Sequence, residues 1–77
     1  MMDFSAALAA AKTGAKVRRV SWEQAEWLVG AYMRVTVLTD PDGESLEAMV
    51  MVYPDGTIRL FADSQWDLLA EDWVLVQ

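Results

Sequence analysis

The residues with the most potential for chemistry lie near the C-terminus, in the stretch SQWDLLAEDWVLV from Ser64 to Val76. On a helix, Asp67 and Glu71 would be neighbours, because they lie four positions apart, and could share a proton or hold a hard cation. Two carboxylates supply only a few of the six or more oxygens that calcium takes as ligands. We expect Asp67 to cap the helix and Glu71 to face solvent. The sequence therefore predicts no metal site here.

Other kinds of catalytic site lack the residues they need. The chain has no histidine, the commonest general base and metal ligand, and no cysteine for thiolate chemistry or disulfides. Its serines lack a histidine to activate them, and the motifs of a lysine-activated serine are missing. The four glycines are scattered and form no phosphate-binding loop. We predict that the protein is not an enzyme, with no catalytic residue and no cofactor.

A binding function fits the sequence better than catalysis. Arginines are scarce in a chain with six basic and twelve acidic residues, and arginine suits bidentate contacts to phosphate. Aromatic side chains offer flat faces on which a base could stack. The alternative is that the aromatic residues fill a core or a subunit interface and that the arginines pair with acids. The residues considered are Arg18, Arg19, Arg34, Trp22, Trp27, Tyr32, Phe61, Trp66 and Trp73.

Length and composition limit the assembly and the partners. The 77 residues predict one domain over residues 1–77, which as a monomer would bury only about 60% of its unfolded surface. Four tryptophans, five methionines and 55% hydrophobic residues exceed what one small core needs. This excess predicts a homo-oligomer, a dimer or tetramer, or else an apolar ligand pocket. The net charge of −6 argues against binding nucleic acid or anionic membranes.

The sequence also predicts a cytoplasmic protein. Asp3 comes early, and the alanine-rich run after it has no charged leader, so the N-terminus does not resemble a signal peptide. No apolar run reaches the roughly 20 residues that a spanning helix needs.

Local patterns predict the elements of the first half. Asp3 is a helix N-cap, the residues that follow place an alanine-rich stripe on one face, and Gly14 ends the helix, giving a helix over 4–13. Residues 16–22 predict a strand, and the polar stretch after it a bend. Residues 27–39 alternate between an apolar face and a mixed face, which predicts the longest strand. In this strand, Gly30 marks a bulge or a close backbone approach.

The second half predicts a meander and a closing helix. Turns at 40–43 and 54–57 contain Pro-Asp-Gly and separate strands over 46–53 and 58–61. Ser64 and Asp67 form a capping box for a helix over 65–71, followed by a strand over 73–76. We expect Leu68, Leu69 and Trp73 to anchor this segment, and Glu71 and Asp72 to lie at its solvated end. The fold class is α+β: a small antiparallel sheet or meander with an N-terminal helix and a short C-terminal helix before a last strand.

Both ends of the chain carry the motifs of a known family. The pattern F-x-x-A-L-x-x-x-K-x-G occurs from Phe4 to Gly14, and K-V-x-R-x-x-W follows from Lys16 to Trp22. Near the C-terminus, a D-G-T turn at 55–57 precedes S-Q-x-D-L-L-A-E-D-W from Ser64 to Trp73. These motifs cover roughly half of the chain. In them the sequence resembles the Thoeris anti-defence proteins of the second type, which are small phage proteins.

The resemblance implies a protein that sequesters a signal. Family members form homo-oligomers, typically tetramers, and bind cyclic ADP-ribose-type signals of bacterial defence, and some also bind cyclic dinucleotides. It implies a phage or prophage protein that acts in the cytoplasm of the bacterial host and breaks no bond. By residue, Arg19 would meet phosphate, Trp22 and Phe61 would hold the base, and Ser64 and Gln65 would give polar contacts at a helix N-terminus.

Three departures from the family pattern concern the pocket. Glu23 to Glu26 stands where the family has a glycine-lysine-glycine loop, the Asp40–Gly43 hairpin replaces a long insertion, and Phe61 replaces a tryptophan. We therefore expect the fold to carry over better than the ligand. The alternative function is a protein-binding inhibitor module that acts on a host defence protein through its acidic surface.

Overall fold

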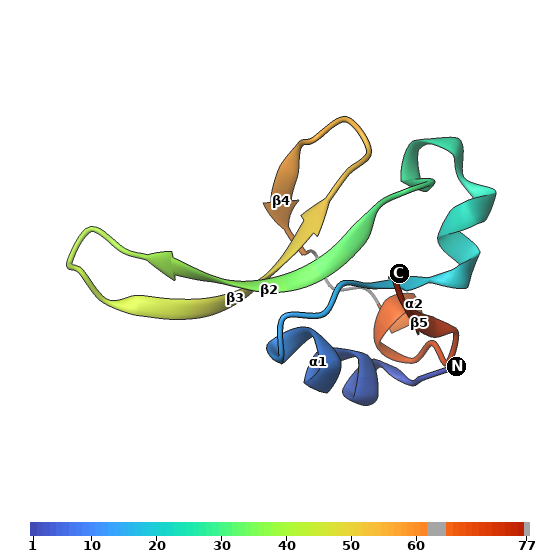
Figure 1. The fold of residues 1–77 in the computed structure, drawn as a ribbon, viewed down its shortest axis with the longest axis horizontal. Coiled ribbons are helices and arrows are strands. Elements are labelled where there is room, and N and C mark those ends of the chain that lie inside the picture. The colour runs from blue at the N-terminus through green and yellow to red at the C-terminus, as the bar shows by residue number, and fades with distance from the viewer. Residues whose placement is uncertain (62–64, 77) are drawn as a thin grey trace.

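Helix α1 packs beside a five-stranded antiparallel sheet in the order β4-β3-β2-β1-β5, in a computed structural model that describes residues 1–61 and 65–76 (Figure 1). The predicted α+β class is confirmed. Two 3-10 helices, η1 and η2, join β1 to β2. The elements are α1 (Phe4–Lys12), β1 (Val17–Arg19), η1 (Val20–Gln24), η2 (Glu26–Leu28), β2 (Tyr32–Thr39), β3 (Ser45–Val52), β4 (Ile58–Leu60), α2 (Gln65–Leu68) and β5 (Trp73–Leu75).

Helix α1 forms as its sequence predicts. The Asp3 carboxylate accepts a hydrogen bond of 2.8 Å from the backbone N–H of Ala6, which satisfies one of the free donors at the helix start. Gly14, directly after the last turn, has a φ of 100°, a value that favours glycine. Ala7 and Ala11 are buried, and their small side chains let the helix lie close to the sheet.

The β2–β3 hairpin is the longest feature of the sheet. Its ladder runs from the Tyr32–Val52 pair to the Thr39–Ser45 pair. The carboxylate of Asp40 accepts from the N–H groups of Asp42 and Glu44 and so closes the turn. Figure 1 shows the far half of this hairpin extending away from both helices as an arm.

The predicted strand over 27–39 is wrong for its first third. Residues 26–28 form η2, and β2 begins only at Tyr32. The alternating residues Trp27 and Val29 do not face the core, because both side chains are exposed. Gly30 breaks the run with a φ of 90°, and an added Cβ there would lie 3.7 Å from the ring of Pro54. Gly30 therefore marks a close approach of two segments, one of the two roles predicted for it.

The boundaries of other elements also differ from those predicted. The strand predicted over 16–22 stops at Arg19, and η1 takes over the chain from Val20. The C-terminal helix ends at Leu68 instead of residue 71, and β5 ends at Leu75. The two predicted hairpin turns join the strands as expected, because β2 pairs with β3 and β3 with β4.

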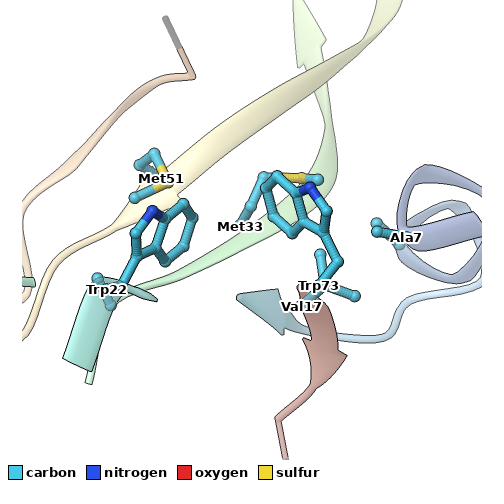
Figure 2. Packing of buried hydrophobic residues seen from close by; sticks show 8 residues of the cluster. Ala7, Val17, Trp22, Met33, Met51 and Trp73 are labelled. Carbon is cyan, nitrogen blue, oxygen red and sulfur yellow. The ribbon is translucent and has the colours of Figure 1, made fainter. Parts of the chain in front are cut away.

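Trp73 occupies the centre of the core. It is fully buried, and the rings of Phe4, Trp22 and Phe61 lie 5.5, 5.4 and 6.3 Å from it between centroids. Figure 2 shows Trp73 between Trp22 and Ala7 of α1. The expected anchoring role of Trp73 is thus confirmed.

The anchoring role expected for Leu68 and Leu69 is wrong. Both side chains are exposed, Leu69 to 79%. Helix α2 has only four residues, so it is too short to turn a full apolar face toward the sheet. The segment is held through Trp73 instead.

None of the helices in the described part of the chain combines the length and apolar character needed to cross a membrane.

Replacing the buried indole tests this description of the core. We expect Trp73→Ala to lower the free energy of unfolding by about 3–5 kcal/mol, because it removes a large buried side chain and leaves a cavity. Trp66 is the matched control, since its side chain is 82% exposed, and Trp66→Ala should change stability by about 0.5 kcal/mol or less. Urea denaturation measures both. Equal losses for the two variants would contradict the assignment of Trp73 as the core residue.

Candidate functional site

The predicted binding residues gather around Trp73. Trp22 and Phe61 both pack edge-on against its ring, and Arg19 is its ladder partner between β1 and β5. Gln65 begins α2, which adjoins the same indole through a hydrogen bond of 3.1 Å from Trp73 Nε1 to the carbonyl oxygen of Asp67. Ser64 lies outside the described residues. The structure thus brings Arg19, Trp22 and Phe61 together, with Gln65 on the neighbouring helix.

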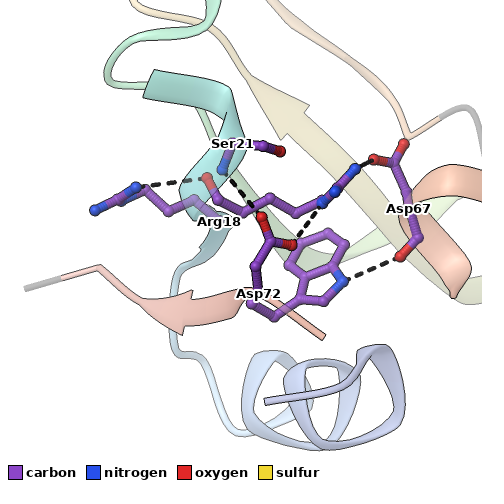
Figure 3. A network of polar contacts seen from close by, with 6 residues as sticks. Arg18, Ser21, Asp67 and Asp72 are labelled. Carbon is purple, nitrogen blue, oxygen red and sulfur yellow. Dashed lines mark hydrogen bonds and ion pairs between the residues drawn. The ribbon is translucent and has the colours of Figure 1, made fainter. Parts of the chain in front are cut away.

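Arg19 is held between two aspartates. Its Nε donates to Asp72 Oδ1 and its Nη1 to Asp67 Oδ1, each at 2.8 Å (Figure 3). The side chain is only 18% exposed. Burial by itself would lower the pKa of Arg19, but the hydrogen bonds to Asp72 and Asp67 outweigh it and raise the pKa above its ordinary value. A phosphate bound here would compete with two carboxylates already in place.

Asp72 is part of this network and not a solvated helix end. Besides Arg19, its other oxygen accepts a hydrogen bond of 3.0 Å from the N–H of Ser21. Burial by itself would raise the pKa of Asp72, but the bonds from Arg19 and Ser21 and the charge of Arg19 lower it below its ordinary value. The prediction that Asp72 lies at a solvated helix end is therefore wrong, because Arg19, 53 residues away in sequence, binds its carboxylate. Glu71 is exposed, as expected.

Asp67 has a wider role than the predicted cap. Its side chain binds Arg19, and its carbonyl oxygen accepts the indole N–H of Trp73. The Ser64 half of the predicted capping box lies outside the described residues. Asp67 therefore connects α2 to β1 and to the core.

Trp22 is a core residue that also borders a small cavity. Only 7% of it is exposed, and the cavity measures about 190 Å³. Arg18 lines the same cavity and forms an ion pair of 2.9 Å with Glu23, another lining residue. Glu23, directly after Trp22, thus neutralises a cation at this cavity. Phe61 is partly buried, and its ring packs on Phe4 as well as Trp73.

A larger cavity of about 500 Å³ lies between η2 and the β3–β4 turn. Trp27 and Tyr53 line it with rings 6.3 Å apart and within 24° of parallel. Arg59 of β4 lies at the same cavity, as do Glu26 and Asp55. A hydrogen bond from the backbone N–H of Thr57 is the main cause that lowers the pKa of Asp55, and Arg59 contributes through its charge.

Sequence reasoning missed this cavity for two reasons. The alternating pattern predicts Trp27 inside a strand, whereas η2 turns its ring outward. The predicted binding arginines do not include Arg59. One signal does point to Arg59: it is the single charged residue in Ile58–Leu60, a short apolar strand directly after a Pro-Asp-Gly turn. Within the described residues, no group of three or more side chains suited to a metal ion occurs.

Acidification tests the Asp72 contacts. Because the folded pKa of Asp72 lies below its unfolded value of about 3.9, its contribution is complete above that pH and is lost as the pH falls through the folded pKa. We expect Asp72→Asn to lower the free energy of unfolding at pH 7 by about 1.5–3 kcal/mol. As the pH falls below about 4, the variant should lose less of its stability than the wild type.

The measurement is urea denaturation over a pH series, with Glu71→Gln as control. Glu71 is the exposed acid next in sequence, so its variant should follow the wild-type pH curve. A wild-type pH dependence retained in full by Asp72→Asn would show that other carboxylates cause it.

Comparison with known proteins agrees with the motifs at both chain ends. No curated protein matches the chain. The sequence model of the Tad2-like family, described as the Thoeris anti-defense 2-like domain, matches residues 2–76. The match covers both the elements around Trp73 and the arm, and the family's description assigns it to Thoeris anti-defence. The chain belongs to the Thoeris anti-defense 2-like family.

Proposed function

We propose that this protein is a phage or prophage anti-defence sponge that binds a cyclic ADP-ribose-type or other cyclic nucleotide immune signal. It acts in the cytoplasm of the bacterial host and keeps the signal from its effector by holding it, without breaking a bond. The observation that carries the proposal is the family match over residues 2–76. Thoeris anti-defence is the activity in the family's name, and capture of the signal is the mechanism proposed here.

The side chains support capture in preference to catalysis. The sequence offers no histidine or cysteine as base or nucleophile. The carboxylates of Asp67 and Asp72, which could have formed an acid pair, are both bound to Arg19. The aromatic rings near Trp73 and at the larger cavity provide surfaces that suit a base, which needs no chemistry to be bound.

The cavity beside Trp22 is small for a ligand. Ligand pockets for small molecules span about 300–1,000 Å³. This cavity holds about 190 Å³, and of Arg19, Trp22, Phe61 and Gln65 it is lined by Trp22 alone. A signal bound at Arg19, Trp22, Phe61, Ser64 and Gln65 would gain an additional wall from a second copy of the chain.

Exposed apolar side chains on the arm support homo-oligomerisation. Leu38 and Leu46 face each other across the β2–β3 ladder, and both are exposed. Val37 is also exposed, on the opposite face of the ladder. The arm extends beyond α1 and the core (Figure 1). Contact between arms of two or more copies would remove this surface from water, which is favourable.

Light scattering after size exclusion tests the oligomer. We expect the wild type to have the mass of a dimer or tetramer at micromolar concentration. The double variant Leu38→Lys/Leu46→Lys should have a lower mass, because fewer copies associate. Leu69→Lys is the control, because Leu69 is also exposed but lies outside the arm. A wild-type mass of 8.6 kDa would refute the oligomer, and loss of mass in the control alone would refute the arm as its interface.

A thermal-shift panel tests the proposed function itself. Cyclic ADP-ribose isomers and cyclic dinucleotides are added to the wild type, and at about 100 times its dissociation constant a ligand stabilises the fold by about 2.7 kcal/mol. We expect at least one member of the panel to raise the melting temperature. Absence of a shift with every member would refute capture of these signals.

One observation favours a second candidate function, binding of a host defence protein. Glu23 and Glu26 lie exposed on η1 and η2, in a protein whose net charge is −6. An acidic surface of this kind suits a basic partner. A partner that co-purifies from host lysate and is lost on Glu23→Lys/Glu26→Lys, with no shift in the nucleotide panel, would favour this alternative.

A further inference from the structure

We infer that the cavity between η2 and the β3–β4 turn is a nucleotide subsite, in which a base stacks on Trp27 and Tyr53 and Arg59 binds phosphate. This inference rests on the proposed function and places part of the ligand away from Trp22. The cavity holds about 500 Å³, within the range of about 300–1,000 Å³ typical of small-molecule pockets.

The two aromatic rings form a surface suited to a planar group. Trp27 and Tyr53 lie within 24° of parallel, with centroids 6.3 Å apart. Trp27 is 68% exposed, so much of its surface has no protein neighbour. Aromatic faces of this kind stack on any base and need no hydrogen-bond pattern.

Arg59 supplies the positive charge that a phosphate requires. Among the described residues, Arg18 pairs with Glu23 and Arg19 with two aspartates. No ion pair or hydrogen bond engages the side chain of Arg59, whose charge acts on Asp55 of the same cavity. Met51 is its ladder partner, and Tyr53 follows two positions after Met51. Tyr53 directly follows β3, and Tyr53 and Arg59 both line the cavity.

The carboxylates at the cavity suit the sugar of a nucleotide. Acidic side chains accept hydrogen bonds from ribose hydroxyls in dinucleotide-binding proteins. Glu26 and Asp55 both line the cavity, and Asp55 Oδ1 already accepts a 2.8 Å bond from the N–H of Thr57. Base, sugar and phosphate thus each find a matching group in one cavity.

The backbone holds these groups in place before any ligand arrives. Tyr53 donates its N–H to Thr57 at 2.9 Å and accepts from the N–H of Gly56 at 2.9 Å, which closes the β3–β4 turn. Pro54 of that turn lies against Gly30, just after η2. Figure 1 shows this turn and the chain between β1 and β2 on the same side of the molecule, away from α1.

Calorimetry with cyclic ADP-ribose, ADP-ribose and a cyclic dinucleotide tests the subsite. For the probe that binds the wild type best, we expect Trp27→Ala and Arg59→Gln each to weaken binding on the order of tenfold or more. The matched controls lie outside the cavity and should leave affinity unchanged. Trp66→Ala removes another exposed tryptophan, and Lys12→Gln removes another positive charge. Both cavity side chains are exposed, so their variants should fold, which a melting curve checks.

NMR of the indole N–H signals gives an independent readout, because the chain has four tryptophans. The Trp27 signal should move on titration, and the Trp66 signal should stay. Wild-type affinity retained by both cavity variants, or movement of the Trp22 signal with Trp27 unmoved, would overturn the subsite and leave the proposed function standing. A wild type that binds none of the probes would overturn both.

Discussion

The burial of Trp73 is the constraint on which the rest of the structure depends. Its backbone exchanges two hydrogen bonds with Met2, at 2.8 and 3.1 Å, so the two ends of the chain meet there. Its indole packs against rings from α1, η1 and the residue after β4, and its Nε1 holds α2 through Asp67. A small domain has little other buried surface to rely on, so this one side chain links most of the elements.

The Arg19 network closes the core beside that tryptophan. The carboxylates of Asp67 and Asp72 would repel each other, and the guanidinium between them offsets the repulsion by binding one oxygen of each. The same pairing bears on the phosphate-binding role expected for Arg19. A cation that organises two aspartates contributes mainly to the scaffold, so family motifs around Trp73 describe the fold more directly than the ligand. The exposed Trp27 of η2 and Arg59 of β4 lie elsewhere, at the larger cavity.

One end of the sheet is covered by the core, and the other end is exposed to solvent. Near α1, Met33 and Met51 are buried between the sheet and the aromatic cluster. Farther along β2 and β3, the ladder continues to Thr39 and Ser45, but the core does not. Part of the apolar excess of the composition therefore lies on the arm, where Val37, Leu38 and Leu46 are exposed and backbone hydrogen bonds maintain the strands. This distribution is what gives association between copies a physical reason.

The sequence by itself determined the elements that depend on near neighbours. Asp3 and Gly14 bound α1, and Pro-Asp-Gly turns fix both hairpins, because caps and turns involve atoms only a few residues apart. The α+β class and the family motifs follow from the same local patterns. Alternation alone could not show that Trp27 would turn outward, because a period of two does not reveal which side chains meet a core.

Only the tertiary structure decided the partners of the charged and aromatic groups. Arg19 meets Asp67 and Asp72 across 48 and 53 residues of sequence, so nothing local marks these acids as buried partners instead of solvated ones. Trp27, Tyr53 and Arg59 likewise share a cavity only because the β3–β4 turn folds back against Gly30. Ion pairs and cavities depend on distances in space, and the fold sets those distances.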